Sequence, residues 1–133
     1  MRVLYIDDDR VNALLFSETC RALSDEGLAL EVETAASGAE ALEIVAAWAP
    51  DALVIDLHLP DTDGHTLLAR LQAQMGDRAV PAWLCTADDG PEVATAARRA
   101  GFTGCWLKPA EAATVRDALA AVMAPGTTVI SAA

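Results

Sequence analysis

Residues 52–56 read Ala-Leu-Val-Ile-Asp, an apolar run that ends directly in an acid. Short runs without polar residues are typical of parallel strands that are covered on both faces. Three more apolar runs occur, and a further run alternates between apolar and acidic residues from Leu30 onward, which is typical of a half-exposed edge strand. The sequence therefore predicts five strands, at Val3–Ile6, Ala29–Thr34, Ala52–Ile55, Ala82–Cys85 and Gly104–Leu107.

Helical patterns separate these strands. Ser37 and Glu40 form a capping box at the start of one helix, and Pro91 occupies a favoured first position of another. Strands that alternate with helices imply parallel pairing through right-handed crossovers. Together with an edge strand that comes second in the chain, this pattern predicts an α/β, flavodoxin-like (βα)5 three-layer sandwich with the strand order 2-1-3-4-5.

The helix that begins at Pro91 should be the least firmly held of the set. It is expected to end before Gly101, and its predicted apolar stripe consists of Val93, Ala96, Ala97 and Ala100. Only one of these side chains is larger than alanine, so the helix buries little apolar area. Because little burial leaves little stabilisation, we predict that this helix is the mobile one.

Length and charge narrow the class of protein. The chain has 133 residues, of which 53% are hydrophobic, so we expect one domain with a single core over residues 1–123 and a loose tail or linker remnant over 124–133. A net charge of −11 argues against nucleic acids and anionic membranes as partners, since both require clustered positive charge. The first apolar run, which ends at Ile6, is too short for a signal peptide or a membrane span.

The three cysteines are widely spaced and each lies in an apolar stretch. This pattern indicates small core side chains in a reducing environment, and therefore a cytoplasmic protein, rather than a disulfide or zinc framework. The residues are Cys20, Cys85 and Cys105.

Polar side chains follow four of the predicted strands. The first strand runs into Asp7-Asp8-Asp9, while Asp56, Thr86 and Lys108 follow the third, fourth and fifth. Because the carboxyl ends of parallel strands meet at one edge of a sheet, these side chains should converge. Lys108 is the only lysine in the chain, and its compact ammonium suits contact with a single phosphoryl oxygen.

Carboxylates that are brought together in this way repel one another. At about 5 Å and an effective dielectric constant near 20, each pair costs roughly 3 kcal/mol. A hard divalent cation removes that cost, and Mg²⁺ fits because it is held by one or two carboxylates together with water and phosphate oxygens. For Asp9 alone we prefer capping of the first helix, whereas Asp7, Asp8 and Asp56 together predict a cation site.

Two other kinds of phosphate chemistry are conceivable on such a sheet. FMN binding would need a hydroxyl- and glycine-rich loop after the first strand, where this chain is acidic. A haloacid-dehalogenase-type phosphatase would need a general acid two positions after its aspartate nucleophile, where this chain has His58. The residues favour an aspartate that accepts a phosphoryl group and keeps it, and a true phosphatase stays open as an alternative.

The chain resembles the receiver domains of bacterial two-component response regulators, from Val3 to about Met123. Four short motifs carry the resemblance in the same order as in that family, namely Leu4–Asp9, Leu53–Gly64, Thr86-Ala87 and Lys108-Pro109. The chain is most similar to the receivers of hybrid histidine kinases, through Asn12, Ala100-Gly101-Phe102 and Trp106.

The resemblance implies how a phosphoryl group and a metal would be held. Asp56 would accept the phosphoryl group from a phosphohistidine on a histidine kinase or a histidine phosphotransfer protein. Asp8 would ligate Mg²⁺ directly and Asp7 through water, while Asp56 and the backbone carbonyl of His58 would complete the protein ligands. Such a domain switches its surface toward a downstream protein target. It is a signalling phospho-acceptor in a two-component system or phosphorelay, not an enzyme acting on an external substrate.

The resemblance also implies how the signal would be transmitted, with one departure. Lys108 would contact the phosphoryl oxygen, Thr86 would hydrogen-bond it and move inward, and Pro109 would follow a cis peptide bond. Cys105 stands where the family usually has Tyr or Phe, so the usual coupling of threonine to an aromatic ring is in question. Trp106 is a second switch candidate, but strand alternation points it to the opposite face, and we prefer core packing for it. The departure motivates an alternative, a degenerate receiver that acts as a phosphorylation-independent interaction module.

Overall fold

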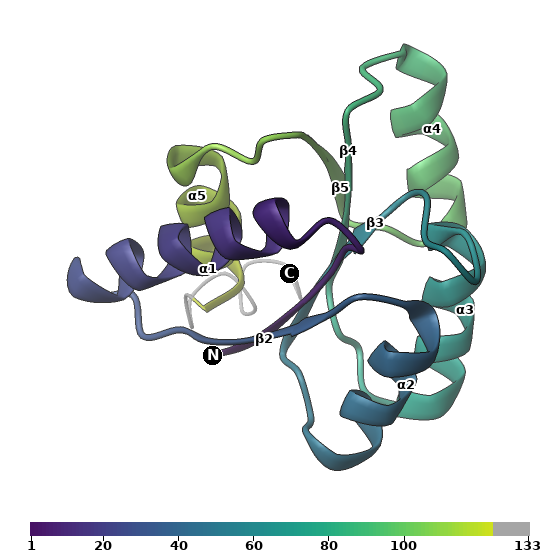
Figure 1. Cartoon of the computed structure of the whole chain (residues 1–133), viewed down its shortest axis with the longest axis horizontal. Helices are drawn as coiled ribbons and strands as arrows, with labels where there is room; N and C mark the ends of the chain where they lie inside the picture. The colour runs from purple at the N-terminus through teal and green to yellow at the C-terminus, as the bar shows by residue number, and fades with distance from the viewer. Residues whose placement is uncertain (124–133) are drawn as a thin grey trace, which may run out of the picture.

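The computed structural model describes residues 1–123. They fold into a parallel five-stranded sheet with helices on both faces (Figure 1). The predicted tail over 124–133 lies outside the described residues. The strand order is β2-β1-β3-β4-β5, which confirms the predicted flavodoxin-like arrangement. The elements are β1 (Arg2–Ile6), α1 (Arg10–Asp25), β2 (Glu31–Ala35), α2 (Gly38–Ala47), β3 (Ala52–Asp56), α3 (Gly64–Met75), β4 (Ala82–Thr86), α4 (Pro91–Ala100), β5 (Gly104–Leu107) and α5 (Ala112–Met123).

Alternation along the strands divides the core into two clusters, one on each side of the sheet. Leu4, Ile6, Leu53, Ile55 and Leu84 face the side that is covered by α2, α3 and α4. The intervening residues face the side that is covered by α1 and α5, among them Val3, Tyr5, Val54, Trp83 and Trp106. Figure 1 shows these two helical layers on either side of the sheet, so the predicted three-layer sandwich is confirmed.

The edge strand β2 begins two residues later than predicted, at Glu31 rather than Ala29. Pairing starts with Arg2 opposite Glu31, while the N-terminal ammonium of Met1 holds the carbonyl oxygen of Ala29 at 3.0 Å outside the regular ladder. Glu31 and Glu33 are exposed while Val32 is half-buried, which confirms the half-exposed edge. β3 and β4 each run one residue further than predicted, so Asp56 and Thr86 are the last residues of their strands.

Helix α4 buries little, as predicted, but its apolar stripe was predicted wrongly in one position. Ala97 is its only buried residue, and Ala96 is exposed whereas Ala94 is half-buried. Val93 and Ala94 line a pocket together with Cys105 of β5, so Ala94 is on the side of the helix that faces β5, where Ala96 was predicted to be. The mobility of this helix stays a prediction.

The loop after β3 is fastened by a close approach of two backbone segments. The N–H of Gly64 donates to the carbonyl oxygen of Leu57 at 2.8 Å. A Cβ atom at Gly64 would lie 2.6 Å from the carbonyl oxygen of Asp56, a distance that real Cβ atoms do not show. Glycine at this position therefore sets how closely α3 approaches the end of β3.

Asp61 joins the same loop to helix α2. Its two carboxylate oxygens accept hydrogen bonds from the backbone N–H groups of Gly38 and Ala39, both at 2.9 Å. These N–H groups belong to the first turn of the helix, where they have no intrahelical partner and where the helix dipole favours negative charge. The contacts lower the pKa of the Asp61 carboxyl below its usual value.

We expect Gly64→Ala to lower the free energy of unfolding by about 1–3 kcal/mol, as overpacking of a filled site does. Gly104→Ala is the matched control, because its Cβ would meet only the Trp83 side chain at 3.4 Å, an ordinary contact. Urea unfolding of both variants measures the difference. Equal stabilities would show that the backbone at Asp56 yields freely.

We expect Asp61→Asn to weaken the dependence of stability on acid pH. The pKa of Asp61 is lower in the folded state than the unfolded value near 3.9, so its contribution is present above that value and is lost as the pH falls through the folded pKa. Chemical unfolding across this acid range measures the change. Asp77→Asn, which removes an exposed carboxylate after α3, is the control against which the change is judged.

Candidate functional site

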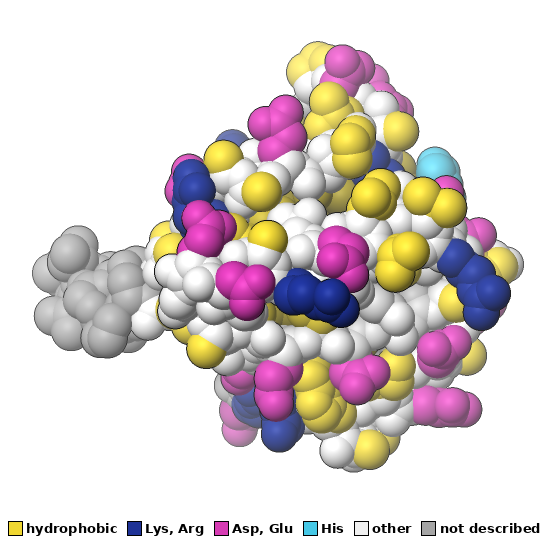
Figure 2. Space-filling model, turned by 60° about the vertical axis from the view of Figure 1, so that its left-hand side comes forward, with side chains coloured by type: hydrophobic (Ala, Val, Ile, Leu, Met, Phe, Trp, Pro, Cys, Tyr) yellow, Lys and Arg dark blue, Asp and Glu magenta, His cyan; other side chains and the backbone are white. Residues whose placement is uncertain are grey.

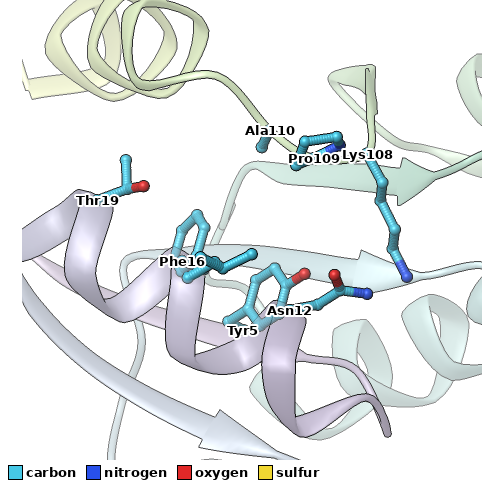
Figure 3. A pocket seen from close by; sticks show the side chains of 8 residues that line it. Tyr5, Asn12, Phe16, Thr19, Lys108, Pro109 and Ala110 are labelled. Carbon is cyan, nitrogen blue, oxygen red and sulfur yellow. The ribbon is translucent and has the colours of Figure 1, made fainter.

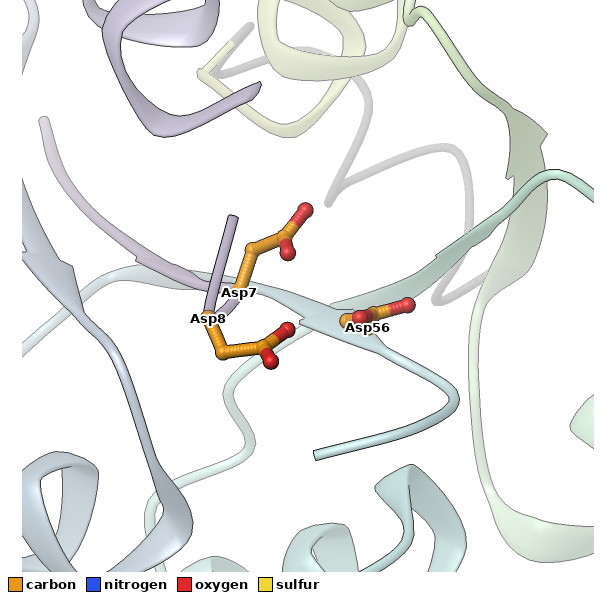
Figure 4. Close-up of side chains that lie close together, drawn as sticks. All are labelled: Asp7, Asp8 and Asp56. Atoms are coloured by element: carbon orange, nitrogen blue, oxygen red, sulfur yellow. The ribbon is translucent and has the colours of Figure 1, made fainter. Parts of the chain in front are cut away.

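Three carboxylates meet at the carboxyl edge of the sheet. Asp7 and Asp8 follow β1, Asp56 ends β3, and each offers an oxygen within 4.8 Å of the others (Figure 4). Asp7 and Asp56 are buried, whereas Asp8 is exposed. An all-oxygen, carboxylate-rich set of this kind suits a hard cation such as Mg²⁺. The predicted convergence is confirmed, and the donor set fits the predicted metal.

Lys108 reaches this edge from the end of β5 and contacts two of the three carboxylates. Its Nζ atom lies 2.8 Å from Oδ2 of Asp7 and 3.1 Å from Oδ1 of Asp56. The backbone N–H of Lys108 donates to the carbonyl oxygen of Thr86 at 2.8 Å, and the Lys108–Pro109 peptide bond is cis, as predicted. The only lysine of the chain thus lies where a point charge balances two buried acids.

Burial and charge act in opposite directions on these groups. Burial raises the pKa of the Asp56 carboxyl, and the Asp7 charge adds to that rise, while the hydrogen bond and the charge of Lys108 lower the pKa without cancelling it. For the Lys108 ammonium, burial alone lowers the pKa, but its contacts with Asp7 and Asp56 outweigh this and leave the pKa raised. Lys108 therefore stays charged, and Asp56 takes up a proton more readily than an exposed aspartate.

The two switch candidates of β5 lie on opposite sides of the sheet. Thr86 is buried, and its Oγ1 accepts a hydrogen bond from the N–H of Asp88 at 3.2 Å. Cys105 packs against the core on the α4 side. Trp106 is buried on the opposite side and stacks on Trp83, with ring centroids 5.2 Å apart. The alternation predicted for Cys105 and Trp106 is confirmed, and Trp106 has the core packing that we preferred for it.

Asp9 and His58 lie in the loops that follow β1 and β3. Asp9 caps helix α1, since its Oδ1 accepts hydrogen bonds from the N–H groups of Val11 and Asn12 at 2.9 and 3.4 Å, which confirms the capping interpretation. His58 has an exposed side chain, and its backbone amide, close to the Asp56 carboxylate, acts to lower the pKa of that group. The role of the His58 carbonyl as a metal ligand stays a prediction.

Sequence reasoning missed one polar group of the site, the hydroxyl of Tyr5. This hydroxyl donates to Oδ2 of Asp7 at 3.0 Å. The signal was present in the sequence, because Tyr5 is the only tyrosine and stands two residues before Asp7, a spacing that places both side chains on one face of a strand. Because its neighbours Val3, Leu4 and Ile6 are aliphatic, the pattern indicates only one more core residue of the strand at Tyr5.

We expect Lys108→Met to lower the unfolding free energy of the metal-free protein by about 3 kcal/mol, because it leaves buried carboxylates without a counter-charge. This is the low end of the range for breaking a buried pair, since Lys108 keeps 15% side-chain exposure. Arg78→Met, which removes an exposed pair with Asp51, is the control and should cost at most about 1 kcal/mol. Guanidinium unfolding in EDTA measures both variants. Equal losses of unfolding free energy would contradict the larger contribution that we assign to the buried ion pairs of Lys108.

Comparison with known proteins places this geometry in a family. The protein-family model of the response regulator receiver domain matches residues 3–120 of this chain. Response regulator MprA of Mycobacterium leprae is 38% identical over 109 residues, covering 82% of this chain and 45% of that protein. The sensory/regulatory protein RpfC of Xanthomonas campestris pv. campestris is 31% identical over 123 residues, covering 90% of this chain and 16% of that protein. The chain therefore spans less than half the length of these relatives.

The solved structures agree with the sequence matches. The chemotaxis protein CheY4 of Vibrio cholerae is 30% identical, with a TM-score of 0.78 over 91% of this chain and 97% of that chain. A two-component response regulator from Clostridium difficile, at 20% identity and a TM-score of 0.80, supports the fold alone. Fold, acidic site and sequence similarity coincide over the same residues. The chain belongs to the receiver domain family of response regulators, whose members are signalling phospho-acceptors.

Proposed function

We propose that residues 1–123 act as one receiver domain, in which Asp56 accepts a phosphoryl group from a phosphohistidine. One observation carries this assignment: the Nζ atom of Lys108 lies 3.1 Å from Oδ1 of Asp56 and 2.8 Å from Oδ2 of Asp7. A single ammonium between two acids is placed to follow negative charge that develops on a group bound to Asp56. Family membership and the cluster of Asp7, Asp8 and Asp56 support the same assignment.

The reaction transfers one group between two side chains. An Oδ atom of Asp56 attacks phosphorus, the bond from phosphorus to the donor imidazole nitrogen breaks, and its electron pair stays on that nitrogen, which takes a proton. The product is an acyl phosphate on Asp56. In such transfers the protein mainly positions groups and balances charge, which here is the part assigned to Lys108 and to the Thr86 hydroxyl.

The carboxylates are the groups that would hold the metal. Asp8 and Asp56 would bind Mg²⁺ directly together with the backbone carbonyl of His58, and Asp7 would bind it through water. When bound, the cation would neutralise the carboxylates and the phosphoryl oxygens. The exposure of Asp8 leaves room on the solvent side for water and for phosphoryl oxygens.

The domain would exchange signals with proteins. A histidine kinase or a histidine phosphotransfer protein would supply the phosphoryl group, and a downstream protein would read the changed surface of α4, β5 and α5. The small buried content of α4 supports this choice of surface, since a lightly held helix shifts at low cost. A stand-alone receiver and a receiver within a longer protein, such as the sensory/regulatory protein RpfC that the chain matches, would both fill this role.

Partners of other kinds have less support. On the face drawn in Figure 2, acidic side chains are spread over the surface with isolated Lys or Arg side chains between them, and the net charge is −11. Neither nucleic acid nor an anionic membrane would be attracted to such a surface. No helix among residues 1–123 is long and apolar enough to cross a membrane. We propose a cytoplasmic location, in keeping with the free thiols of Cys20, Cys85 and Cys105.

A second candidate rests on Cys105. Without an aromatic ring at this position the domain could bind its target in one fixed state, as a phosphorylation-independent module. The ion pairs of Lys108 with Asp7 and Asp56 favour the phospho-accepting function, because a module without phosphoryl chemistry has no need to bury opposed charges at the edge of its sheet.

We expect acetyl phosphate with Mg²⁺ to add one phosphoryl group to the wild-type protein, and none to Asp56→Asn, since the amide oxygen is a poor nucleophile. Intact-protein mass spectrometry measures the addition, and EDTA should abolish it. Asp51→Asn, which alters an acid at the opposite end of β3, is the matched control and should be modified like the wild type.

Beryllofluoride with Mg²⁺ separates the two candidate functions. A phospho-accepting receiver should show amide NMR shifts at Asp56 and Thr86 and further along α4 and β5. Unchanged spectra together with an unmodified wild-type mass would contradict the phospho-accepting assignment and support the fixed module.

A further inference from the structure

Tyr5 is a buried aromatic residue with one polar contact. Its side chain is almost fully enclosed, at 3% exposure, and its ring stacks on Phe16 with centroids 4.5 Å apart and planes 13° apart. The hydroxyl donates to Oδ2 of Asp7 at 3.0 Å. In Figure 3 the ring lies beside Phe16, and its hydroxyl points toward the region where Lys108 enters from the β5 end. The ring is held by packing while the hydroxyl belongs to the charged site.

Asp7 has the three donors that a buried carboxylate needs. Its Oδ1 accepts from the N–H of Asp9 at 2.9 Å, and its Oδ2 accepts from the Tyr5 hydroxyl and from Nζ of Lys108 at 3.0 and 2.8 Å. The side chain of Asp7 is only 1% exposed, so bulk solvent has little access with which to replace a lost partner. A buried carboxylate that loses a donor bears the cost of its desolvation.

The two donors on Oδ2 differ in freedom. Lys108 has a flexible stem, keeps 15% side-chain exposure and also contacts Oδ1 of Asp56 at 3.1 Å, so it can turn toward a group on Asp56. Tyr5 cannot follow, since it belongs to strand β1 and its ring is stacked on Phe16. A phenol is protonated at neutral pH, so the Tyr5 hydroxyl remains a donor to Oδ2 of Asp7.

We propose that Tyr5 is a positioning residue that holds the Asp7 carboxylate in place and keeps it hydrogen-bonded when Lys108 turns from Asp7 toward a phosphoryl group on Asp56. The first part concerns the geometry of the cation site and stands on the contacts alone. The second part rests on the proposed function. Tyr5 thereby lowers the cost of the change in partner that Lys108 undergoes.

The first test is Tyr5→Phe, which keeps the ring and its stacking on Phe16 and removes only the hydroxyl. We expect Mg²⁺ affinity to fall about tenfold, the effect of a hydrogen bond to a charged group, because Asp7 is no longer oriented. At saturating Mg²⁺ the maximal rate of Asp56 modification by acetyl phosphate should fall, while the acetyl phosphate concentration that gives half of that rate should stay unchanged. Mg²⁺ titration followed by tryptophan fluorescence and rates followed by mass spectrometry measure these effects.

Two further variants separate positioning from packing. Phe16→Leu removes the stacked ring but leaves the Tyr5 hydroxyl, so it should lower stability to urea without a comparable loss of Mg²⁺ affinity. Adding Tyr5→Phe to Asp7→Asn should change Mg²⁺ affinity no further, since the hydroxyl acts through Asp7. Wild-type affinity and rate in Tyr5→Phe, or an equal loss in the Asp7→Asn background, would overturn the proposal.

The unaltered protein offers an independent readout, because Tyr5 is its only tyrosine. Tyrosine labelled with carbon-13 at Cζ gives one resonance that reports the hydrogen bond of the hydroxyl. We expect this resonance to shift when Mg²⁺ is added and again when beryllofluoride follows, as Lys108 leaves Oδ2 of Asp7. A resonance that stays in place through both additions would overturn the proposal. If acetyl phosphate fails to modify the wild-type protein, the proposed function fails, while the Mg²⁺ titrations still decide the role of Tyr5.

Discussion

The contact of one ammonium with two buried carboxylates governs the carboxyl edge of this sheet. Lys108 lies within 2.8 and 3.1 Å of Asp7 and Asp56, and both acids are largely withdrawn from water. Buried charges of like sign are tolerated only where an opposite charge compensates them. The parallel topology supplies that compensation, because it brings the ends of β1, β3 and β5 to one edge although they are far apart in sequence.

Helix α4 is packed less firmly than the helical layer on the other face of the sheet. On the α1 and α5 side, stacked pairs of large rings fill the core, Tyr5 on Phe16 and Trp83 on Trp106. Large rings bury much apolar area and hold their neighbours in place, which suits a layer that supports the charged site. On the opposite side α4 buries only Ala97. The proposed switching surface at α4 would be favoured by this difference, because a lightly packed helix shifts at low cost.

Cys105 of β5 lies next to β4 and faces helix α4, where a small side chain leaves space. A pocket between α4 and β5 is lined by Asp88, Val93, Cys105 and Leu107, among others, and the small thiol leaves that space open. Thr86 lies at the end of the adjacent strand and bonds the N–H of Asp88. Movement of the loop after β4 would therefore meet small side chains and open space instead of an aromatic ring.

Strand positions, the edge strand and the convergence of Asp7, Asp56 and Lys108 were predictable from the sequence alone. Apolar runs that each end in a polar residue define a parallel sheet, and a parallel sheet aligns the ends of its strands. The family motifs near Asp56 and Lys108 further predicted that this site accepts a phosphoryl group.

Only the tertiary structure decided which groups touch. The hydrogen bond from Tyr5 to Asp7, the capping of α2 by Asp61 and the inward turn of Ala94 in place of Ala96 were not predictable. Local pattern shows which residues are apolar and which element they form, but a contact also requires the distance and rotation between packed elements. Those are set by how all the side chains of the core fill space together, and no single stretch of sequence contains that information.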